Sequence, residues 1–597
     1  MFQSFETKTD PADGPPRLAA LRAQMSDLDI AAFIVPRADA HQGEYVAPRD
    51  ERLAWLTGFT GSAGFAAITA SNAGVFIDGR YRVQVRSQVA LDHFTPVPWP
   101  QTKLAEWLVE HLSDGSRIGF DPWLHTPDEL KKLRKATEKA GLIFVPVANP
   151  IDAIWADQPA PPTGPVAVHP IEFAGESHSE KRARLATDLT GPAIITLPDS
   201  IAWLLNIRGS DIVRNPVPHA FALLHPDATV DLLIDGAKID ADVQAHLGPD
   251  IRLHGPDRFS ALLETLEGPV QIDGASAPQW VLDQLDPEKV AIVWRRDPCI
   301  LPKARKNPAE IQGMEVAHLR DGVAMAEFLC WLDEMAPKGG LTEIEVVQKL
   351  EAFRRVDNGL RDISFETIAG SGPNGAIVHY RVTHETNRSV TPGELLLIDS
   401  GGQYLDGTTD ITRTVATGPV GVDEKSCFTR VLQGMIAISR AQWPKGISGR
   451  DLDALARYPL WTAGQDYDHG TGHGVGAYLS VHEGPQRLSR QSTIPLEVGM
   501  CLSNEPGYYR EGAFGIRIEN LIHVITAPEI AGQDDREMLA FATLTYVPID
   551  TRLIDQTILT ATERDWLNNY HAEVATRLGP RVSPNTRTWL DRVTAPI

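Results

Sequence analysis

The sequence contains an internal repeat, and this repeat limits the folds open to its first half. Residues 53–62 (LAWLTGFTGS) resemble residues 201–210 (IAWLLNIRGS), and residues 75–79 (VFIDG) resemble residues 232–236 (LLIDG). A helix-like stretch followed by a short apolar strand precedes each copy, the alternation typical of mixed α/β structure. Because distant similarity of this kind indicates a duplicated unit, we predict two copies of one α/β domain.

The composition indicates a globular chain and excludes several classes of protein. Of its 597 residues, 43% are hydrophobic and 22% are charged. No apolar run approaches the roughly 18 residues that span a bilayer, and the acidic, proline-containing start lacks the features of an export signal, so we expect no membrane association and a cytoplasmic location. A formal net charge of −22, from 78 acidic and 56 basic residues, disfavours a nucleic-acid partner.

A third unit begins near residue 307. Asn307 as N-cap, Pro308 at the first helical position and Glu310 three residues past the cap predict a helix start. Apolar residues then recur at helical spacing, which predicts a long amphipathic helix: Val316, Leu319, Val323, Ala326 and Cys330. From about Glu394 the sequence changes to short β-branched segments and glycine turns, which predict antiparallel sheet and an α+β domain.

Two pairs of acidic residues are predicted to face each other across hairpins in this unit. A hairpin centred near residues 404–405 brings Asp399 and Asp410 side by side, and one centred near Gly512 places Glu505 opposite Glu519. An aspartate used only for turn chemistry is a poor explanation of Asp399, because it follows the apolar run Leu395–Ile398. Adjacent carboxylates repel unless a cation or a proton lies between them.

Histidines in a glycine-rich segment complete this constellation. His469 and His473 stand in the sequence HGTGHGVG, and His482 follows. Helix is costly among so many glycines, but in an extended chain His469 and His473 share a face. Four carboxylates and one neutral imidazole carry a charge of −4, which two divalent cations balance. The oxygen-rich set favours Mn²⁺, with Zn²⁺ or Co²⁺ as alternatives, and a two-metal site suits hydrolysis of an unactivated bond.

These residues resemble a known family, the long, cytosolic-type aminopeptidases P, also called Xaa-Pro aminopeptidases, whose catalytic domain has the pita-bread fold. The resemblance covers nearly the whole chain, in Asp39-Ala-His-Gln-Gly-Glu-Tyr45, Asp78-Gly-Arg-Tyr81, Lys306-Asn-Pro-Ala-Glu310, Leu544-Thr-Tyr-Val-Pro-Ile-Asp550 and Trp566-Leu-Asn-Asn-Tyr-His571. It implies two creatinase-like α/β domains (1–160 and 161–304), a pita-bread catalytic domain (305–535) and a C-terminal extension packed on it (536–597).

The resemblance also implies roles for the site residues. The metal ligands fall on Asp399, Asp410, His473, Glu505 and Glu519, with Asp410 and Glu519 bridging both ions, Asp399 serving one, and His473 with Glu505 serving the other. Glu505 is the expected general base. Arg517 is expected to share a strand face with Glu519 and to support it without binding the metal. Three histidines match positions around the substrate: His482 is assigned to the carbonyl or oxyanion, and His469 and His379 to substrate positioning or proton transfer.

The expected activity is removal of the N-terminal residue from peptides with proline at the second position, by a homodimer. Within enzymes, the alternative is a prolidase that accepts dipeptides only. From a different class, the alternatives are a non-catalytic pita-bread protein or a creatinase-like enzyme that works without metal. The two N-terminal domains and the C-terminal tail match the long form, and all five ligand positions are filled.

Overall fold

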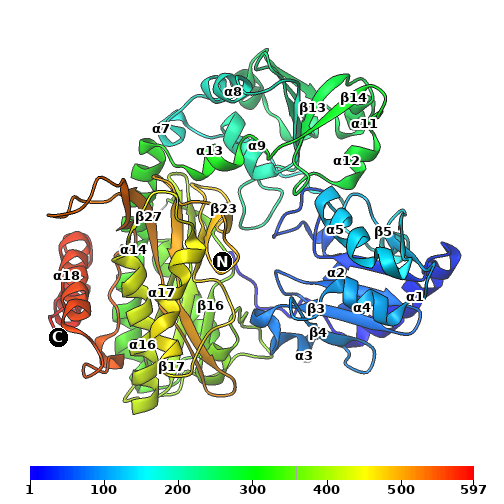
Figure 1. Cartoon of the computed structure of the whole chain (residues 1–597). Coiled ribbons are helices and arrows are strands. Elements are labelled where there is room, and N and C mark those ends of the chain that lie inside the picture. Colours follow the sequence, from blue (N-terminus) through cyan, green and yellow to red (C-terminus); the bar gives the residue numbers. More distant parts are fainter. Residues whose placement is uncertain (358) are drawn as a thin grey trace. The chain divides into compact units, whose positions relative to one another are not determined.

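The structure is a computed structural model that describes residues 1–357 and 359–597. The chain divides into two compact units: an N-terminal unit, Lys8–Lys303, and a C-terminal unit, Ala304–Ile597 with Met1–Thr7 (Figure 1). The first residues belong with the C-terminal unit because Phe5 is buried in its core, in a cluster that contains Met325 and Tyr380. The boundaries predicted at residues 160 and 535 stay predictions.

The N-terminal unit contains two six-stranded sheets with the same topology. Their strand orders, β4-β3-β2-β1-β5-β6 and β12-β11-β10-β8-β13-β14, correspond position by position, and so do the strand directions. The predicted repeat is therefore confirmed. The strands are β1 (Ala32–Pro36), β2 (Phe65–Thr69), β3 (Ala73–Ile77), β4 (Thr95–Pro98), β5 (Arg117–Phe120), β6 (Ile143–Pro146), β8 (Ala193–Ile195), β10 (Phe221–Leu224), β11 (Val230–Leu233), β12 (Ile251–His254), β13 (Gly268–Ile272) and β14 (Val290–Trp294).

Both faces of the first sheet are covered, because side chains alternate along each strand. On β1, Phe33 and Val35 pack with α1 (Gly14–Asp27), α2 (Arg52–Thr57), α3 (Gln84–Gln88) and α6 (Pro150–Ile154), whereas Ala32 and Ile34 pack with α4 (Leu104–His111) and α5 (Pro127–Thr137). In the second copy, α11 (Phe259–Leu263) and α12 (Gln279–Asp283) cover one face of the sheet.

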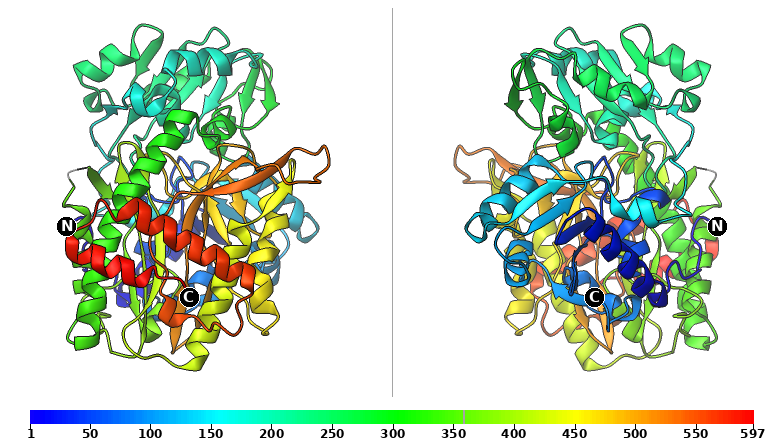
Figure 2. Two further views of the ribbon diagram at one scale, coloured as in Figure 1. Left: turned by 90° about the vertical axis from the view of Figure 1, so that its left-hand side faces the viewer. Right: turned by 90° about the vertical axis from the view of Figure 1, so that its right-hand side faces the viewer.

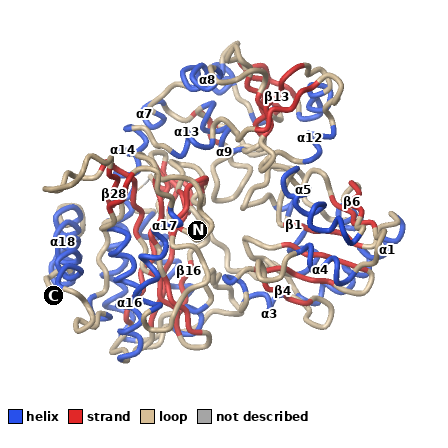
Figure 3. Tube along the Cα trace, viewed as in Figure 1, coloured by secondary structure: helices blue, strands red, loops and turns tan. Residues whose placement is uncertain are grey.

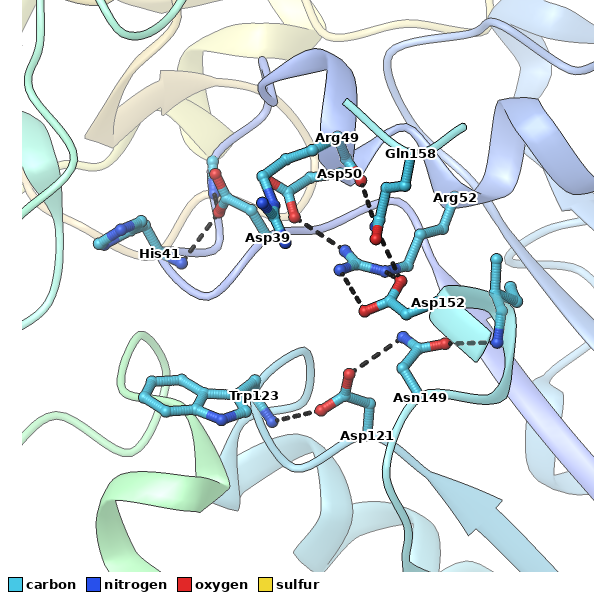
Figure 4. Close-up of polar contacts among 12 residues, drawn as sticks. Asp39, His41, Arg49, Asp50, Arg52, Asp121, Trp123, Asn149, Asp152 and Gln158 are labelled. Carbon is cyan, nitrogen blue, oxygen red and sulfur yellow. Dashed lines mark hydrogen bonds and ion pairs between the residues drawn. The ribbon is translucent and has the colours of Figure 1, made fainter. Parts of the chain in front are cut away.

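A buried arginine joins two helices of the first copy. Arg52 of α2 forms ion pairs with Asp152 of α6, with Nε 2.6 Å from Oδ1, and with Asp50, 2.8 Å away (Figure 4). Nearby, the Asp39 carboxylate accepts a hydrogen bond of 2.9 Å from the backbone N–H of His41. These contacts stabilise the loops that follow β1.

The C-terminal unit packs helices against antiparallel sheets (Figure 3). Its long helices are α14 (Pro308–Met335), α15 (Glu343–Arg354), α16 (Val422–Ser439) and α17 (Gly449–Trp461). The strands are β15 (Leu360–Ile363), β16 (Ile368–Ser371), β17 (Leu395–Ser400), β18 (Gly402–Tyr404), β19 (Gly407–Thr408), β20 (Ile411–Ala416), β21 (Gln442–Pro444), β22 (Gly472–Gly474), β23 (Glu483–Leu488), β24 (Cys501–Asn504), β25 (Gly507–Arg510), β26 (Phe514–Arg517), β27 (Asn520–Thr526) and β28 (Met538–Thr543).

The predicted start of α14 is confirmed. Asn307 accepts hydrogen bonds from the N–H groups of Ala309 and Glu310, and Glu310 accepts one from Asn307, which completes a capping box. The predicted apolar face is wrong at Val316, whose side chain is exposed, while Met314 and Ala317 are buried. The buried face is broader than a single stripe, because β19 and the C-terminal helices both pack on α14.

Two helices end the chain and pack on the C-terminal unit. Helix α18 (Ala561–Leu578) contacts α14 and α16, and α19 (Pro584–Val593) contacts α14; Figure 2 shows both in red. Leu567, Val574 and Leu590 are fully buried in the same apolar cluster as α16 and β26. Among the described residues, we find no helix with the length and hydropathy needed to cross a bilayer.

Candidate active site

The two predicted hairpins form and gather the acidic residues. Strand β17 pairs with β20 so that Asp399 lies opposite Thr412, and Asp410 immediately precedes β20. The turn between them is the β18–β19 hairpin, in which Tyr404 pairs with Gly407. Asp399 and Asp410 thus lie on neighbouring strands, as the sequence predicts, and both are buried.

Glu505 and Glu519 also lie at corresponding positions of two paired strands. In β24 and β27, Asn504 pairs with Asn520, so Glu505 and Glu519 are the next residues outward on the two strands. Beyond them, β25 and β26 form a hairpin whose turn contains Gly512 with a φ of 76°, a conformation that glycine adopts at no steric cost. The Glu519 carboxylate accepts a 2.8 Å hydrogen bond from the Thr412 hydroxyl, which ties the two strand pairs together.

His473 points its Nε2 atom at these carboxylates. It lies on β22, with Nε2 3.6 Å from Asp410 Oδ2 and 3.4 Å from Glu505 Oε1. Its Nδ1 is 2.9 Å from the carbonyl oxygen of Gly474, and an Nδ1–H donated to that carbonyl leaves the Nε2 lone pair for a metal. The ligand atoms of Asp410, His473 and Glu519 all lie within 4.8 Å of one another.

The electrostatics of the cluster favour a bound cation. Burial, followed by the neighbouring carboxylates, raises the pKa values of Asp410 and Glu519 well above their usual range, and burial with the charge of Asp399 raises the pKa of Glu505 to about 7. Within the described chain, Asp399 Oδ1 and Glu519 Oε1 are buried without a hydrogen-bond partner. Since buried polar atoms of this kind are rarely left unsatisfied, the residues fit divalent metal ions.

Arg517 supports the cluster through Asp399. Its Nη2 donates to Asp399 Oδ2 at 2.5 Å, and its Nε donates to the Thr412 hydroxyl at 3.2 Å. The sequence predicts that Arg517 supports Glu519; in the structure its hydrogen bonds reach Glu519 through the Thr412 hydroxyl. The guanidinium therefore faces the carboxylates as one fixed positive charge.

A hydrogen-bonded chain connects His469 to the same arginine. His469 Nε2 is 2.9 Å from the Tyr509 hydroxyl, and Arg517 Nη1 donates to that hydroxyl at 2.6 Å. Burial raises the pKa of Tyr509 to about 12, so the phenol stays protonated. Sequence reasoning missed Tyr509, because nothing in the pattern separates it from Tyr508 beside it.

The other two histidines occupy different surroundings. His482 packs edge to face on His473, with ring centroids 4.3 Å apart, so it adjoins the carboxylate cluster. His379 follows the turn η8 (Gly372–Ala376), which packs on β26, and is half-buried. Its neighbour Tyr380 donates a 2.9 Å hydrogen bond to Glu343.

Comparisons with known proteins agree with this architecture. The Creatinase/Prolidase N-terminal domain matches residues 17–154 and again, in a second form, residues 157–310. Metallopeptidase family M24 matches residues 312–526, and the C-terminal region of that peptidase family matches residues 537–597. Two creatinase-type domains are followed along the chain by an M24 domain that contains a cluster of carboxylates and a histidine. These features define the class of this protein: it is a metallopeptidase.

Individual relatives narrow the class to one family. Aminopeptidase P2 of Arabidopsis thaliana is 40% identical over 97% of this chain and 88% of its own, and aminopeptidase P1 of Lotus japonicus is 36% identical over 97% and 99%. The crystal structure of X-prolyl aminopeptidase from Caenorhabditis elegans, described as a cytosolic enzyme with a di-nuclear active site, matches with a TM-score of 0.93, 34% identity and coverage of 98% and 99%. The chain belongs to the aminopeptidase P family.

Proposed function

We propose that this protein is a metal-dependent Xaa-Pro aminopeptidase, which hydrolyses the bond between the first residue of a peptide and a proline at the second position. The observation that carries the proposal is the cluster of Asp399, Asp410, His473, Glu505 and Glu519, in which the three residues Asp399, Asp410 and Glu519 are buried and two carboxylate oxygens have no partner in the described chain. The similarity to aminopeptidases P over nearly the full chain supports the substrate class.

The five residues of the cluster are proposed to hold two divalent ions. Asp410 and Glu519 are assigned as shared ligands, Asp399 to one ion, and His473 with Glu505 to the other. Mn²⁺ is proposed because four of the five ligands are carboxylates, while Zn²⁺ and Co²⁺ also bind such sets. When bound, such ions polarise a carbonyl group and lower the pKa of water.

The surrounding side chains are proposed to handle protons and orientation. Glu505, whose Oε1 lies 3.4 Å from His473 Nε2, is assigned as the general base. His482, edge to face with His473, is assigned to the carbonyl or oxyanion. His469 is held by Tyr509 and, with His379, is assigned to substrate positioning and to proton delivery to the proline nitrogen.

A comparison of two substrates tests the proposal. Metal-stripped protein, with and without added Mn²⁺, is incubated with Arg-Pro-Pro and with the dipeptide Ala-Pro, and release of the N-terminal residue is measured. We expect Mn²⁺-dependent release from the tripeptide. Cleavage of the dipeptide alone would indicate a prolidase, and no cleavage of either by metal-loaded protein would favour a non-catalytic pita-bread or creatinase-like protein.

The assembly is proposed to be a homodimer, and the location cytoplasmic. Leu455, Tyr458 and Trp461 recur on one side of α17 with 43%, 65% and 43% of their surface exposed, and an apolar row of this kind suits contact with a second copy. Light scattering of wild-type protein and of Tyr458→Glu tests the dimer, because the variant is expected to shift toward monomer. The location is proposed from the relative described as cytosolic.

A further inference from the structure

The C-terminal unit contains a buried ion pair that the assigned chemistry does not use. The Lys306 ammonium contacts the Glu483 carboxylate, and both side chains are at most 1% exposed. Lys306 itself is fixed by its backbone: its N–H donates to the carbonyl of Gly499 at 3.0 Å, and Arg305 forms a bridge with Met500. The ammonium therefore projects from a rigid position just before α14.

Glu483 lies next to two site histidines. It follows His482 in sequence and begins β23, and it pairs with Gly474, the residue that follows His473 on β22. The β22–β23 register shifts between His473 and Gly474, and such an irregularity redirects the side chains beside it. The two strands lie close here, because a Cβ on Gly474 would come within 2.4 Å of the Glu483 carbonyl oxygen.

The geometry of the two imidazoles depends on this ribbon. The rings of His473 and His482 are 4.3 Å apart at an interplanar angle of 81°, so a small rotation of β23 moves one ring relative to the other. A buried carboxylate that loses its countercharge is strongly destabilised, and the ammonium of Lys306, a residue outside the β22–β23 ribbon, meets the Glu483 carboxylate. The position of Glu483, and of the histidine before it, is thereby tied to Lys306.

We propose that Lys306, acting through its ion pair with Glu483, is a positioning residue that holds His473 and His482 in the arrangement needed for metal binding and catalysis. The catalytic part of this inference rests on the proposed function. Alteration of residues that orient metal ligands without binding the metal themselves typically lowers metal affinity or activity by about 10- to 100-fold. The same effect is expected for Lys306.

Neutral variants test the proposal against an adjacent control. Lys306→Met and Glu483→Gln are expected to lower the affinity of metal-stripped protein for Mn²⁺, measured by calorimetry with Mn²⁺ alone, and to lower kcat more than they raise KM. The matched control is Arg305→Met, which removes an exposed ion pair with Glu497, 2.8 Å long, at the neighbouring position. This control is expected to match wild type in Mn²⁺ affinity and kcat.

A double variant separates positioning from stability. Each single change leaves one buried charge without its partner and lowers the melting temperature, whereas Lys306→Met with Glu483→Gln removes both charges and recovers much of it. If the ion pair positions the histidines, the double variant still shows the 10- to 100-fold loss of Mn²⁺ affinity and kcat. Wild-type Mn²⁺ affinity and kcat in the double variant would overturn the proposal.

A second variant keeps the test decisive if the neutral proteins do not fold. Glu483→Asp retains the charge but withdraws the carboxylate by one methylene, so it is expected to weaken Mn²⁺ binding and kcat at a melting temperature near wild type; unchanged values would contradict the proposal. If wild-type protein binds Mn²⁺ but cleaves no Xaa-Pro peptide, the proposed function fails, while the Mn²⁺ affinities still decide whether Lys306 positions His473.

Discussion

At the scale of single residues, the site is defined by charges that the protein alone leaves uncompensated. Asp410 and Glu519 are buried beside Asp399 and Glu505, whose negative charges add to burial in raising the cost of ionising Asp410 and Glu519. Arg517 offsets part of this repulsion through its contact with Asp399. The remaining negative charge is what a divalent cation neutralises, so metal binding favours the ionised forms of Asp410, Glu505 and Glu519.

The first prediction removes one ligand at a time. Asp399→Asn and Glu519→Gln are each expected to lower turnover by at least about 100-fold and to abolish stable retention of two metal ions, since an amide has neither the negative charge nor the second oxygen of a carboxylate. Elemental analysis after dialysis and hydrolysis of Arg-Pro-Pro are the measurements. A variant that keeps full metal content and full activity would refute the ligand assignment.

The second prediction concerns Tyr509, which links His469 to Arg517. Tyr509→Phe deletes the hydroxyl that contacts both. Because Arg517 holds the proposed ligand Asp399, and groups that orient ligands change activity by about 10- to 100-fold when altered, kcat/KM is expected to fall by about this factor. Tyr508→Phe on the same strand is the matched control and is expected to behave as wild type. Equal activities of the two variants would exclude a role for the Tyr509 hydroxyl.

At the scale of elements, the sequence predicts those features that local chemistry determines. The capping box at Asn307 and the hairpin turn at Gly512 depend on short-range rules, and both form as predicted. The exposure of Val316 and the contacts of Thr412 and Tyr509 depend on which strands and helices meet, which no local pattern encodes. The sequence predicts His473 as a site residue, but only the structure shows that it lies beside the register shift between β22 and β23.

The third prediction is a pH dependence in the docking of α18. His571 Nε2 accepts the N–H of Ile549 at 3.1 Å, and burial with the charge of Arg413 lowers the pKa of His571 from 6.5 to about 4. As the pH falls, the imidazole of His571 is protonated in the unfolded chain before it is protonated in the folded protein. The contribution of neutral His571 to the free energy of unfolding is therefore fully present above pH 6.5 and is lost as the pH falls toward 4, on the order of 1–3 kcal/mol.

The measurement is urea unfolding across this pH range, for wild type and for His571→Gln. The variant retains an acceptor but has no proton to bind, so the difference between the two unfolding free energies is expected to change between pH 6.5 and pH 4. A constant difference across the range would show that His571 does not contribute to the pH dependence.

At the scale of the whole molecule, a duplicated N-terminal unit accompanies a C-terminal unit that carries every proposed ligand. The two copies keep one strand order although their sequences match only in short stretches. The corresponding strands β3 and β11 are both buried along their length, and the apolar matches at residues 75–79 and 232–236 make the repeat detectable from sequence. Since no proposed metal ligand lies in Lys8–Lys303, stability and metal binding can be perturbed separately.

The fourth prediction uses this separation. Arg52→Met leaves Asp50 and Asp152 without their ion pairs, and we expect a loss of about 2–3 kcal/mol, less than the 3–5 kcal/mol of a fully buried pair because Asp152 is 35% exposed. Lys103→Met, which breaks a pair with Glu106 in which both side chains are exposed, is expected to cost less than about 1 kcal/mol. Denaturant unfolding measures both, and Mn²⁺ retention is expected to stay at the wild-type level; its loss in Arg52→Met would contradict the separation.

The most direct test of the central claim is a titration of metal-stripped wild-type protein with Mn²⁺, in which bound ions per chain and the rate of Arg-Pro-Pro hydrolysis are measured together. We expect no hydrolysis by the stripped protein and a rate that rises as binding approaches two ions per chain. Full activity without metal, or Mn²⁺ binding that brings no hydrolysis, would contradict the central claim.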